Sequence, residues 1–332
     1  MPSPNASSST LDPSKRISFI GGGNMGAAII GGLLANGYPA KNITVSEPNA
    51  SSREHLEKTF GVFTTSDNDA AVAFTAGGGG GGDRGADLVM LAVKPQIMRD
   101  VARGIAKSVQ KHKPVVVSIA AGILIKDLAA WLATDADGAS LPGAAPPALI
   151  RVMPNTPALV LEGAAGLFAT AEVSNEQKKL AFDVLGAVSK AAYWVDREEL
   201  LDVVTAVSGS GPAYFFLMVE CLTKSAVELG LPEDIALGLA RQTCLGAGRM
   251  LVDTAEDPAE LRRKVTSPNG TTHAAVESFL AGGLRKTIKD AVVAATERGE
   301  SLGKEFSNVS VISCEGSKHW NSLLTVGCLI RQ

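Results

Sequence analysis

Cysteine is scarce in this sequence, and its few copies lack the spacing of a metal site or a disulfide framework. The chain has 332 residues and only four cysteines, none of them in a Cys-x-x-Cys pair. Zinc sites and small disulfide scaffolds depend on closely spaced cysteines. The sequence therefore predicts a reduced intracellular protein without a metal centre.

An excess of basic residues is also missing. Lys and Arg number 31 against 34 Asp and Glu, which gives a net charge of −3. A nucleic-acid-binding surface needs a clustered basic excess, so we expect no such partner. Residues 1–15 are rich in Ser and Pro and lack the apolar core of a secretion signal and the repeated Arg of an organelle presequence. They predict a disordered leader on a cytoplasmic protein with no membrane partner.

Several common catalytic arrangements are absent from the sequence. It has no Gly-x-Ser-x-Gly nucleophile elbow and no phosphate loop ending in Gly-Lys-Ser/Thr. Of the four histidines, only His273 falls at a plausible site, and a surface position on a helix explains it more simply. Hydroxy-acid dehydrogenases of the lactate type need a His base to take the hydroxyl proton, so this chemistry is disfavoured.

A strand, a glycine-rich turn and a helix follow one another near the N-terminus. Arg16–Ile20 has the β-branched and aromatic content of a buried strand, and a Gly-x-Gly-x-x-Gly turn leads from it into small apolar residues. In this context the turn is typical of dinucleotide binding, with the pyrophosphate at the helix N-terminus. The predicted contacts are Gly21, Gly23, Asn24, Met25 and Gly26.

The residues after the second strand leave the type of nicotinamide cofactor open. The strand ends at Ser46, and Glu47 is placed to bind the ribose 2′-hydroxyl of NADH. Ser46, Ser51, Ser52 and Arg53 are equally placed to bind the 2′-phosphate of NADPH, although a solvated helix N-terminus explains Ser51 and Arg53 as well. We expect Ser46, Glu47 and Arg53 beside the cofactor.

Further apolar segments alternate with helices, as in a doubly wound α/β sheet. Strands are predicted at residues 87–93, 114–119, 148–152, 163–169 and 192–195, with a helix at 175–188 before the last. Ligands lie at the carboxyl ends of such strands, so Val93, Lys94, Pro95, Ala120, Ala121 and Gly122 are predicted cofactor contacts. Lys94 is read as a backbone contact rather than a proton donor. Six glycines at 77–82 predict a flexible insertion at 76–85.

The C-terminal part of the chain reads as helical. The predicted helices 214–229 and 235–252 are apolar on nearly all sides, and one small helical domain cannot bury both. We expect a subunit interface to bury these helices. We therefore expect a dinucleotide-binding domain at 16–172, a helical domain at 173–306 and an atypical tail at 307–332.

A helix end, a tight loop and a new helix lie between Leu261 and Leu280. Pro268 ends the first helix, Asn269 and Gly270 tolerate left-handed dihedrals, and Thr271 or Thr272 can cap the next helix. Unpaired N–H groups at such a helix start can hold a carboxylate or a phosphate. An ordinary helix corner with a good cap would explain the same residues.

The run VTSPNGTTHAAVESF resembles the signature of the pyrroline-5-carboxylate reductases, and we take the chain for a fungal-type member. Asn269 stands where the family has glycine. The Val-Lys-Pro turn at 93–95 and the Arg-x-Met-Pro-Asn-Thr-Pro run at 151–157 are also similar to family segments, and the resemblance covers about residues 17–306. It implies an N-terminal Rossmann domain, a C-terminal all-α dimerisation domain, and an interlocked homodimer that assembles further into a ring of dimers, a decamer.

The resemblance also implies a function. This is the NAD(P)H-dependent reduction of L-1-pyrroline-5-carboxylate to L-proline, the final step of proline biosynthesis, with NADPH favoured and NADH as the alternative. Backbone amides of the loop would hold the substrate carboxylate, and Thr272 would be the catalytic residue that faces the ring nitrogen. The implied substrate contacts are Ser267, Asn269, Gly270, Thr271, Thr272, Ser208 and Ser210, and Asn155 would lie against the nicotinamide.

Two other functions stay open on the sequence alone. One is a Rossmann-type oxidoreductase for another imine or for a hydroxy acid, because a fold does not fix the chemistry. The other is a nucleotide-binding homologue without turnover, which the glycine insertion and the unusual tail would fit.

Overall fold

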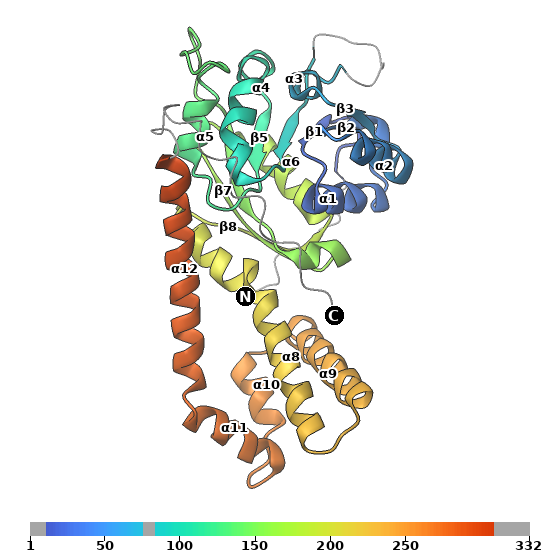
Figure 1. The fold of residues 1–332 in the computed structure, drawn as a ribbon, viewed down its shortest axis with the longest axis vertical. Coiled ribbons are helices and arrows are strands. Elements are labelled where there is room, and N and C mark those ends of the chain that lie inside the picture. Colours follow the sequence, from blue (N-terminus) through green and yellow to red (C-terminus); the bar gives the residue numbers. More distant parts are fainter. Residues whose placement is uncertain (1–10, 76–83, 309–332) are drawn as a thin grey trace, which may run out of the picture.

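An eight-stranded sheet organises one unit of the molecule, and helices form a second unit beyond it (Figure 1). The computed structural model describes residues 11–75 and 84–308. The strand order is β3-β2-β1-β4-β5-β6-β7-β8, and every neighbouring pair is parallel except β6 with β7. The strands are β1 (Ile17–Ile20), β2 (Ile43–Ser46), β3 (Phe63–Thr65), β4 (Leu88–Leu91), β5 (Val115–Ser118), β6 (Leu149–Met153), β7 (Gly163–Ala169) and β8 (Ser189–Trp194). We call residues 17–194 the sheet unit.

Helices cover both faces of this sheet, which explains why its central strands are apolar throughout. Every residue of β1, β2, β4 and β5 is buried. One face packs against α1 (Asn24–Ala35), α2 (Ala50–Phe60) and α6 (Asn175–Gly186), and the other against α3 (Asn68–Val72), α4 (Met98–His112) and α5 (Ile125–Trp131). Such two-sided burial produces near-continuous apolar strands rather than alternating ones.

The predicted strands are confirmed, with two differences. The short edge strand β3 was not predicted, since its three residues are only half-buried and carry no apolar run. The last strand, β8, begins at Ser189 rather than at 192, and it belongs to the same sheet as β1. Both β8 and α6 lie beyond residue 172, so the sheet continues past the domain boundary expected from the sequence.

Parts of three other expected segments lie outside the described residues. These are residues 1–10 of the leader, 76–83 of the glycine insertion and 309–332 of the tail. The last described helix ends at Asn308, two residues into the segment that we expected to be tail.

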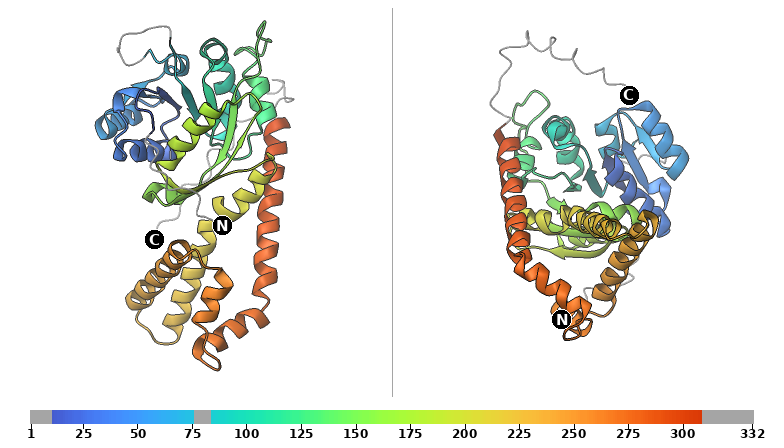
Figure 2. Two further views of the ribbon diagram at one scale, coloured as in Figure 1. Left: turned by 180° about the vertical axis from the view of Figure 1, so that it is seen from behind. Right: turned by 60° about the horizontal axis from the view of Figure 1, so that its bottom comes forward.

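The helical unit, residues 200–308, begins with a broken helix and returns to the sheet. Its elements are α7 (Leu200–Val204), the π-helix η4 (Thr205–Gly209), α8 (Gly211–Glu228), α9 (Glu233–Asp253), α10 (Pro258–Lys264), α11 (Thr271–Ala281) and α12 (Leu284–Asn308). Figures 1 and 2 show α12 running from the far end of the helical unit back to α5. There Phe306 packs against the turn at Gly122, where an added Cβ would lie 2.9 Å from its ring.

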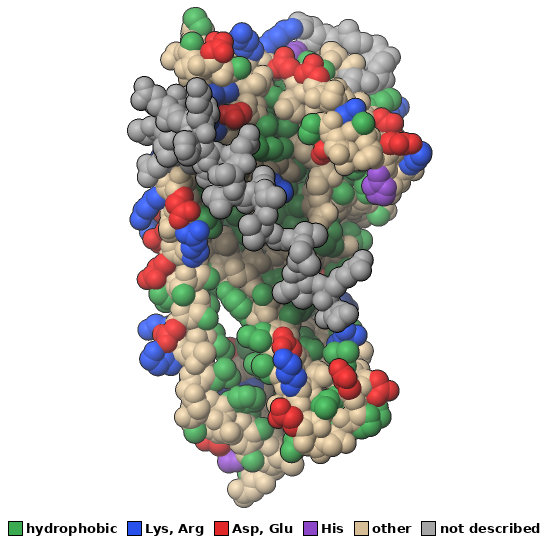
Figure 3. Space-filling model, in the orientation of Figure 1, with side chains coloured by type: hydrophobic (Ala, Val, Ile, Leu, Met, Phe, Trp, Pro, Cys, Tyr) green, Lys and Arg blue, Asp and Glu red, His purple; other side chains and the backbone are tan. Residues whose placement is uncertain are grey.

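Apolar side chains of α8 and α9 reach solvent in the single chain. Phe216 is 69% exposed and Leu239 is 58% exposed, and Figure 3 shows apolar side chains at the surface of the helical unit among scattered charges. Within the described residues one helical stretch, Leu200–Glu228, has the length and composition of a membrane span. Only 22% of its apolar window is buried, which also fits a subunit interface.

Close packing of α1 on the turn after α6 makes Gly32 a test of the sheet unit. A Cβ at Gly32 would lie 2.5 Å from a methyl group of Val188 and 2.6 Å from the carbonyl oxygen of Ala187. We expect Gly32→Ala to lower the free energy of unfolding by about 1–3 kcal/mol because the helix must move away. Denaturant titration measures this change.

The matched control for that experiment is Gly104→Ala in α4. A Cβ at Gly104 would meet nothing within 4 Å, so alanine should raise the free energy of unfolding by up to about 1 kcal/mol. Equal effects of the two substitutions would contradict the packing of α1 described here.

Candidate active site

The glycine-rich turn between β1 and α1 forms an open cradle at a helix N-terminus. Gly21 has φ +100°, and a Cβ there would lie 2.7 Å from the carbonyl oxygen of Ala92. Gly26 lets α1 approach β1, since its Cβ would lie 2.9 Å from the carbonyl oxygen of Gly21. These two glycines are required by the fold itself.

Gly23 differs from those two glycines because the fold does not require glycine at this position. A Cβ there would meet nothing within 4 Å, and Gly23 and Asn24 are both exposed. Gly23 is the N-cap of α1, no side chain caps this helix, and its first turn has no acidic residue. The cradle therefore suits an anion that approaches the backbone closely, as the pyrophosphate of a dinucleotide does.

The expected adenosine-side residues do not all face the cofactor. Ser46 is only 1% exposed, and its hydroxyl donates to Oδ1 of Asn68 at 2.5 Å, which removes its side chain from the candidate contacts. The carboxylate of Glu47 accepts from the Gly22 N–H at 3.2 Å, so it lies against the glycine turn. Arg53 donates from Nη1 to the carbonyl oxygens of Glu47 at 2.7 Å and Pro48 at 2.9 Å. Glu47 and Arg53 thus lie together beyond β2.

The turn after β4 lies beside this cradle, and the turn after β5 follows at the same edge of the sheet. An added Cβ at Gly21 would lie 3.0 Å from a methyl group of Val93, and the exposed Lys94 precedes the 3₁₀ turn η2 (Pro95–Ile97). After β5, Ala121 is exposed, whereas Ala120 and Gly122 are buried. Because Gly122 packs against Phe306, Ala121 is the residue of this turn whose backbone is open to a cofactor.

A cavity of about 330 Å³ lies where the end of β6 meets the start of α8. Its lining is mainly apolar and comes from Asn155, Pro157, Val207, Ser208, Gly211, Pro212, Phe215 and Phe216. The Ser208 hydroxyl donates to the Val204 carbonyl oxygen at 3.0 Å, and Ser210 is half-buried at the N-cap of α8. An apolar pocket with few polar groups is typical of a small-molecule site.

The side chain of Asn155 is committed to the protein and not to a ligand. Its Nδ2 donates to the Ser208 carbonyl oxygen at 3.1 Å, and its Oδ1 accepts from the Ala164 N–H at 2.8 Å. With 8% of its surface exposed, Asn155 forms part of the pocket wall. These two bonds take the place of the direct cofactor contact that was expected for the Asn155 side chain.

The structure contains a buried ion cluster on β6 that the sequence did not reveal. Arg151 on β6 bonds Glu198 at 3.0 Å and Asp202 at 3.3 Å, and Glu198 also accepts from the Ile125 N–H at 2.9 Å. Burial raises the pKa of the Asp202 carboxyl, and the positive charge of Arg151 opposes this rise. The cluster joins β6, α5 and α7, and only the Arg-x-Met-Pro-Asn-Thr-Pro run hinted at Arg151.

The Ser267–Thr272 loop has the expected backbone but a different cap. Asn269 has φ +59°, in the left-handed region, and the Gly270 N–H donates to the Ser267 carbonyl oxygen at 3.0 Å. The N-cap of α11 is Gly270 and no side chain caps it, so the prediction of Thr271 or Thr272 as the cap was wrong. Both threonines belong to the first turn of α11 and are exposed.

This loop lies far from the glycine cradle of its own chain. Figures 1 and 2 show α10 and α11 at the end of the helical unit, with the sheet at the opposite end of the molecule. The glycine cradle and the turns after β4 and β5 thus belong to the sheet unit and the α8 pocket lies at its border with the helical unit, whereas the Ser267–Thr272 loop lies at the far end of the helical unit.

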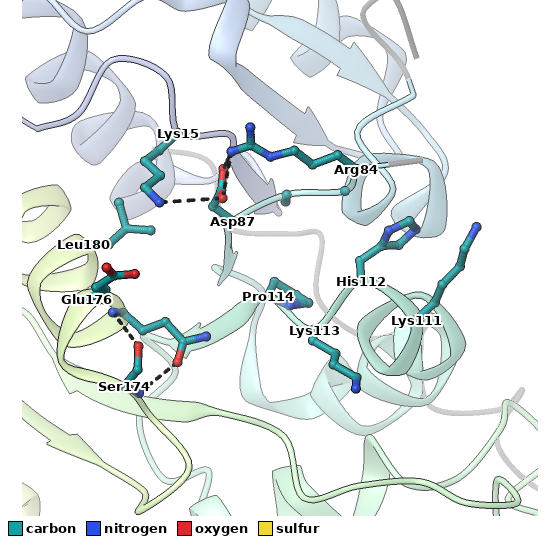
Figure 4. Close-up of a pocket in the computed structure, with 13 residues that line it drawn as sticks. Lys15, Arg84, Asp87, Lys111, His112, Lys113, Pro114, Ser174, Glu176 and Leu180 are labelled. Carbon is teal, nitrogen blue, oxygen red and sulfur yellow. Dashed lines mark hydrogen bonds and ion pairs between the residues drawn. The ribbon is translucent and has the colours of Figure 1, made fainter. Parts of the chain in front are cut away.

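A larger cavity, of about 490 Å³, lies at the opposite edge of the sheet (Figure 4). Asp87, just before β4, is paired there with Lys15 at 3.9 Å and Arg84 at 2.9 Å, and it accepts from the Arg16 N–H at 2.8 Å. Ser174 and Gln177 close the N-terminus of α6 with a capping box. These charges and donors satisfy one another, and ligands of parallel sheets bind at the carboxyl edge. We do not place the active site there.

Comparisons with known proteins agree with this division of the chain. Residues 198–302 match the family described as pyrroline-5-carboxylate reductase dimerisation, and residues 16–122 match the family described as NADP oxidoreductase, coenzyme F420-dependent. The chain is 44% identical over 291 residues to the pyrroline-5-carboxylate reductase of Pseudomonas aeruginosa, which covers 88% of this chain and 98% of that protein. It is 36% identical to the Glycine max reductase, over 86% of this chain and 95% of that one.

Solved structures show the same similarity. The pyrroline-5-carboxylate reductase of Coxiella burnetii superposes with a TM-score of 0.77 at 37% identity, over 87% of this chain and 98% of that one. The Plasmodium falciparum pyrroline carboxylate reductase with NADP bound gives a TM-score of 0.71 at 26% identity, over 88% and 99%. None of these four relatives is fungal, so the fungal-type expectation is not supported.

Gly23→Ala tests the cradle directly. Because the added methyl group points into open space and Gly23 has an ordinary φ of −67°, we expect the melting temperature of the cofactor-free protein to stay unchanged. The methyl group would hold the pyrophosphate away from the backbone, so NADPH affinity should fall by about tenfold or more. Fluorescence titration with NADPH measures this loss, and undiminished affinity would remove the cradle from the site.

Proposed function

The chain belongs to the pyrroline-5-carboxylate reductase family, and on this premise we propose how its own residues reduce L-1-pyrroline-5-carboxylate to L-proline. It is an NADP-linked oxidoreductase of proline biosynthesis. The observation that carries the proposal is the uncapped N-terminus of α1, where Gly23 leaves the backbone open to a pyrophosphate. NADPH supplies the hydride for the imine carbon when it is bound there.

The cofactor contacts that we propose follow the carboxyl edge of the sheet. Gly21, Gly23, Asn24, Met25 and Gly26 would hold the pyrophosphate. Glu47 and Arg53 would face the adenosine ribose, since they lie together beyond β2. Val93, Lys94, Pro95 and Ala121 would continue toward the nicotinamide. We favour NADPH because Arg53 can attract its 2′-phosphate. NADH is the alternative because the Glu47 carboxylate would repel that phosphate.

The substrate contacts that we propose lie at the start of α11. The backbone N–H groups of Thr271 and Thr272, in the first turn of α11, would hold the substrate carboxylate at a helix N-terminus. The Thr272 hydroxyl would bond the ring nitrogen and fix which face of the imine receives the hydride. A protonated imine is already an electrophile, so the reaction needs positioning and exclusion of water more than a side-chain acid or base.

A second copy of the chain would bring these two sets of contacts together. The glycine cradle lies in the sheet unit and the Ser267–Thr272 loop at the far end of the helical unit, and the apolar faces of α8 and α9 are open to solvent (Figures 1 and 3). The family match at 198–302 is to a dimerisation domain. We therefore propose a homodimer in which the loop of one chain faces the cradle and the α8 pocket of the other. A further ring of dimers, a decamer, and a cytoplasmic location are proposed with it.

The direct test follows the oxidation of NADPH and of NADH by absorbance when pyrroline-5-carboxylate is added to the purified protein. Substrate-dependent oxidation with proline as the product establishes the reductase, and the ratio of the two rates shows how Glu47 and Arg53 are used. Turnover with a different imine or a hydroxy acid only would replace the substrate. Nucleotide binding without any turnover would identify a non-catalytic homologue.

Thr272→Ala tests the substrate loop. We expect kcat to fall by about ten- to a hundredfold without being abolished, because the cofactor and the carboxylate contacts remain in place. Thr287→Ala in α12, whose hydroxyl donates to the Gly283 carbonyl oxygen within the helix, serves as the control. Unchanged turnover in folded Thr272→Ala protein would remove Thr272 from the mechanism.

Leu239→Glu tests the proposed dimer. A carboxylate on the exposed apolar face of α9 would be buried without a partner on association, which costs several kcal/mol. We expect light scattering to show mainly single chains and turnover to be lost in parallel. Lys107→Glu on the exposed side of α4 is the control. A fully active single-chain Leu239→Glu protein would contradict a site shared between copies.

A further inference from the structure

The helical unit begins with a break that leaves one carbonyl group without its helical partner. In a regular α-helix the carbonyl oxygen of Ser208 would accept from the N–H of residue 212. Residue 212 is proline and has no N–H. The next N–H, of Ala213, donates to Ser210 at 3.0 Å. Ser208 is the last but one residue of the π-helix η4, directly before the break, so its carbonyl oxygen needs a donor from outside the helix.

A second backbone group, on the neighbouring strand β7, also lacks a main-chain partner. The antiparallel ladder of β6 and β7 runs from Ile150 with Ala169 to Met153 with Gly166. Continued by two residues, the same register would place Asn155 opposite Ala164. The chain turns into the 3₁₀ helix η3 (Thr156–Val160) instead, and the Asn155 carbonyl oxygen accepts from Ala158 at 3.1 Å. The Ala164 N–H therefore has no main-chain partner in this continuation.

The side chain of Asn155 satisfies both groups at once. Its Nδ2 donates to the Ser208 carbonyl oxygen at 3.1 Å, and its Oδ1 accepts from the Ala164 N–H at 2.8 Å. A primary amide offers a donor and an acceptor on one short stem, whereas aspartate has no donor and alanine has neither. Asn155 is 8% exposed, so water does not readily replace either bond.

We propose that Asn155 is a positioning residue for the reduction, which fixes the start of α8 against the carboxyl end of β6. This inference rests on the proposed function. Asn155 acts through Ser208 and the wall of the 330 Å³ pocket, without touching the reacting atoms. Close packing beside it supports the same contact, since a Cβ at Gly209 would lie 2.6 Å from the terminal methyl group of Met153. A small shift of this wall would misplace the imine over the nicotinamide.

The test compares Asn155→Asp with Asn36→Asp. Asn36 also donates from Nδ2 to backbone carbonyl oxygens, of Gly32 at 2.9 Å and Ala187 at 3.5 Å, but it lies at the end of α1 away from the pocket. We expect Asn155→Asp to lower kcat by about tenfold or more and to leave KM for NADPH within about twofold. Asn36→Asp should lower the melting temperature while kcat is kept. Asn155→Ala, which adds no charge, is measured in parallel in case the aspartate prevents folding.

Hydrogen exchange gives a second readout that does not depend on turnover. Loss of the Asn155 bonds should speed exchange at residues 205–215 in both Asn155 variants but not in Asn36→Asp. Unchanged exchange there, or kcat within twofold of the parent, would overturn the inference. So would a raised KM for NADPH at unchanged kcat, which would make Asn155 a direct cofactor contact. If the parent protein exchanges slowly at residues 205–215 but shows no turnover, the result would contradict the proposed function and not this inference.

Discussion

Apolar surface that one chain cannot bury is the constraint on which the rest of the structure depends. The α8 and α9 helices carry large exposed side chains such as Phe216 and Leu239, while the sheet unit is closed on both faces by its own helices. A second copy is therefore the cover that we propose for these faces, in agreement with the match to a dimerisation family. In the proposed dimer the same association would bring the Ser267–Thr272 loop, at the far end of the helical unit, to the glycine cradle in the sheet unit of the other chain (Figure 1).

The two ends of the site differ in how rigidly the chain holds them. The cradle lies at the edge of a buried parallel sheet, and the α8 pocket is tied to that sheet through Asn155 and the Arg151 cluster. The Ser267–Thr272 loop connects two exposed helices. The proposed mechanism depends on positioning and suits such an arrangement, because the fold would set the cofactor side and association would set the substrate side.

Much of the sheet unit could be predicted from the sequence because strands that are buried on both faces consist of continuous apolar residues. The glycine turn could be predicted equally well. Gly21 and Gly26 are required by close backbone contacts, and Gly23 completes the Gly-x-Gly-x-x-Gly spacing. The β3 strand escaped prediction because a three-residue, half-buried edge strand leaves almost no pattern. The sheet extends past the expected boundary at residue 172 because β8 pairs with β7 across α6, and such pairing is not local.

The errors at the site have a common physical cause. Whether Ser46 faces a cofactor depends on Asn68, and the role of Asn155 depends on Ala164 and Ser208, all of which are distant in the sequence. Side-chain bonds of this kind follow from strand register and helix breaks, which a linear pattern does not specify. The Thr271 cap was wrong for a local reason, since the extended Gly270 takes the N-cap position itself.

Mixing two impaired variants tests most directly whether the site is shared between copies. Gly23→Asp places a carboxylate in the pyrophosphate cradle, and Thr272→Ala damages the substrate loop. If each site uses the cradle of one chain and the loop of the other, a mixed dimer has one intact site. Equal mixing, by co-refolding or co-expression, should then restore about a quarter of the parent activity. Activity that stays at the average of the two separate variants would contradict the account, because it would place the cradle and the loop of each site on the same chain.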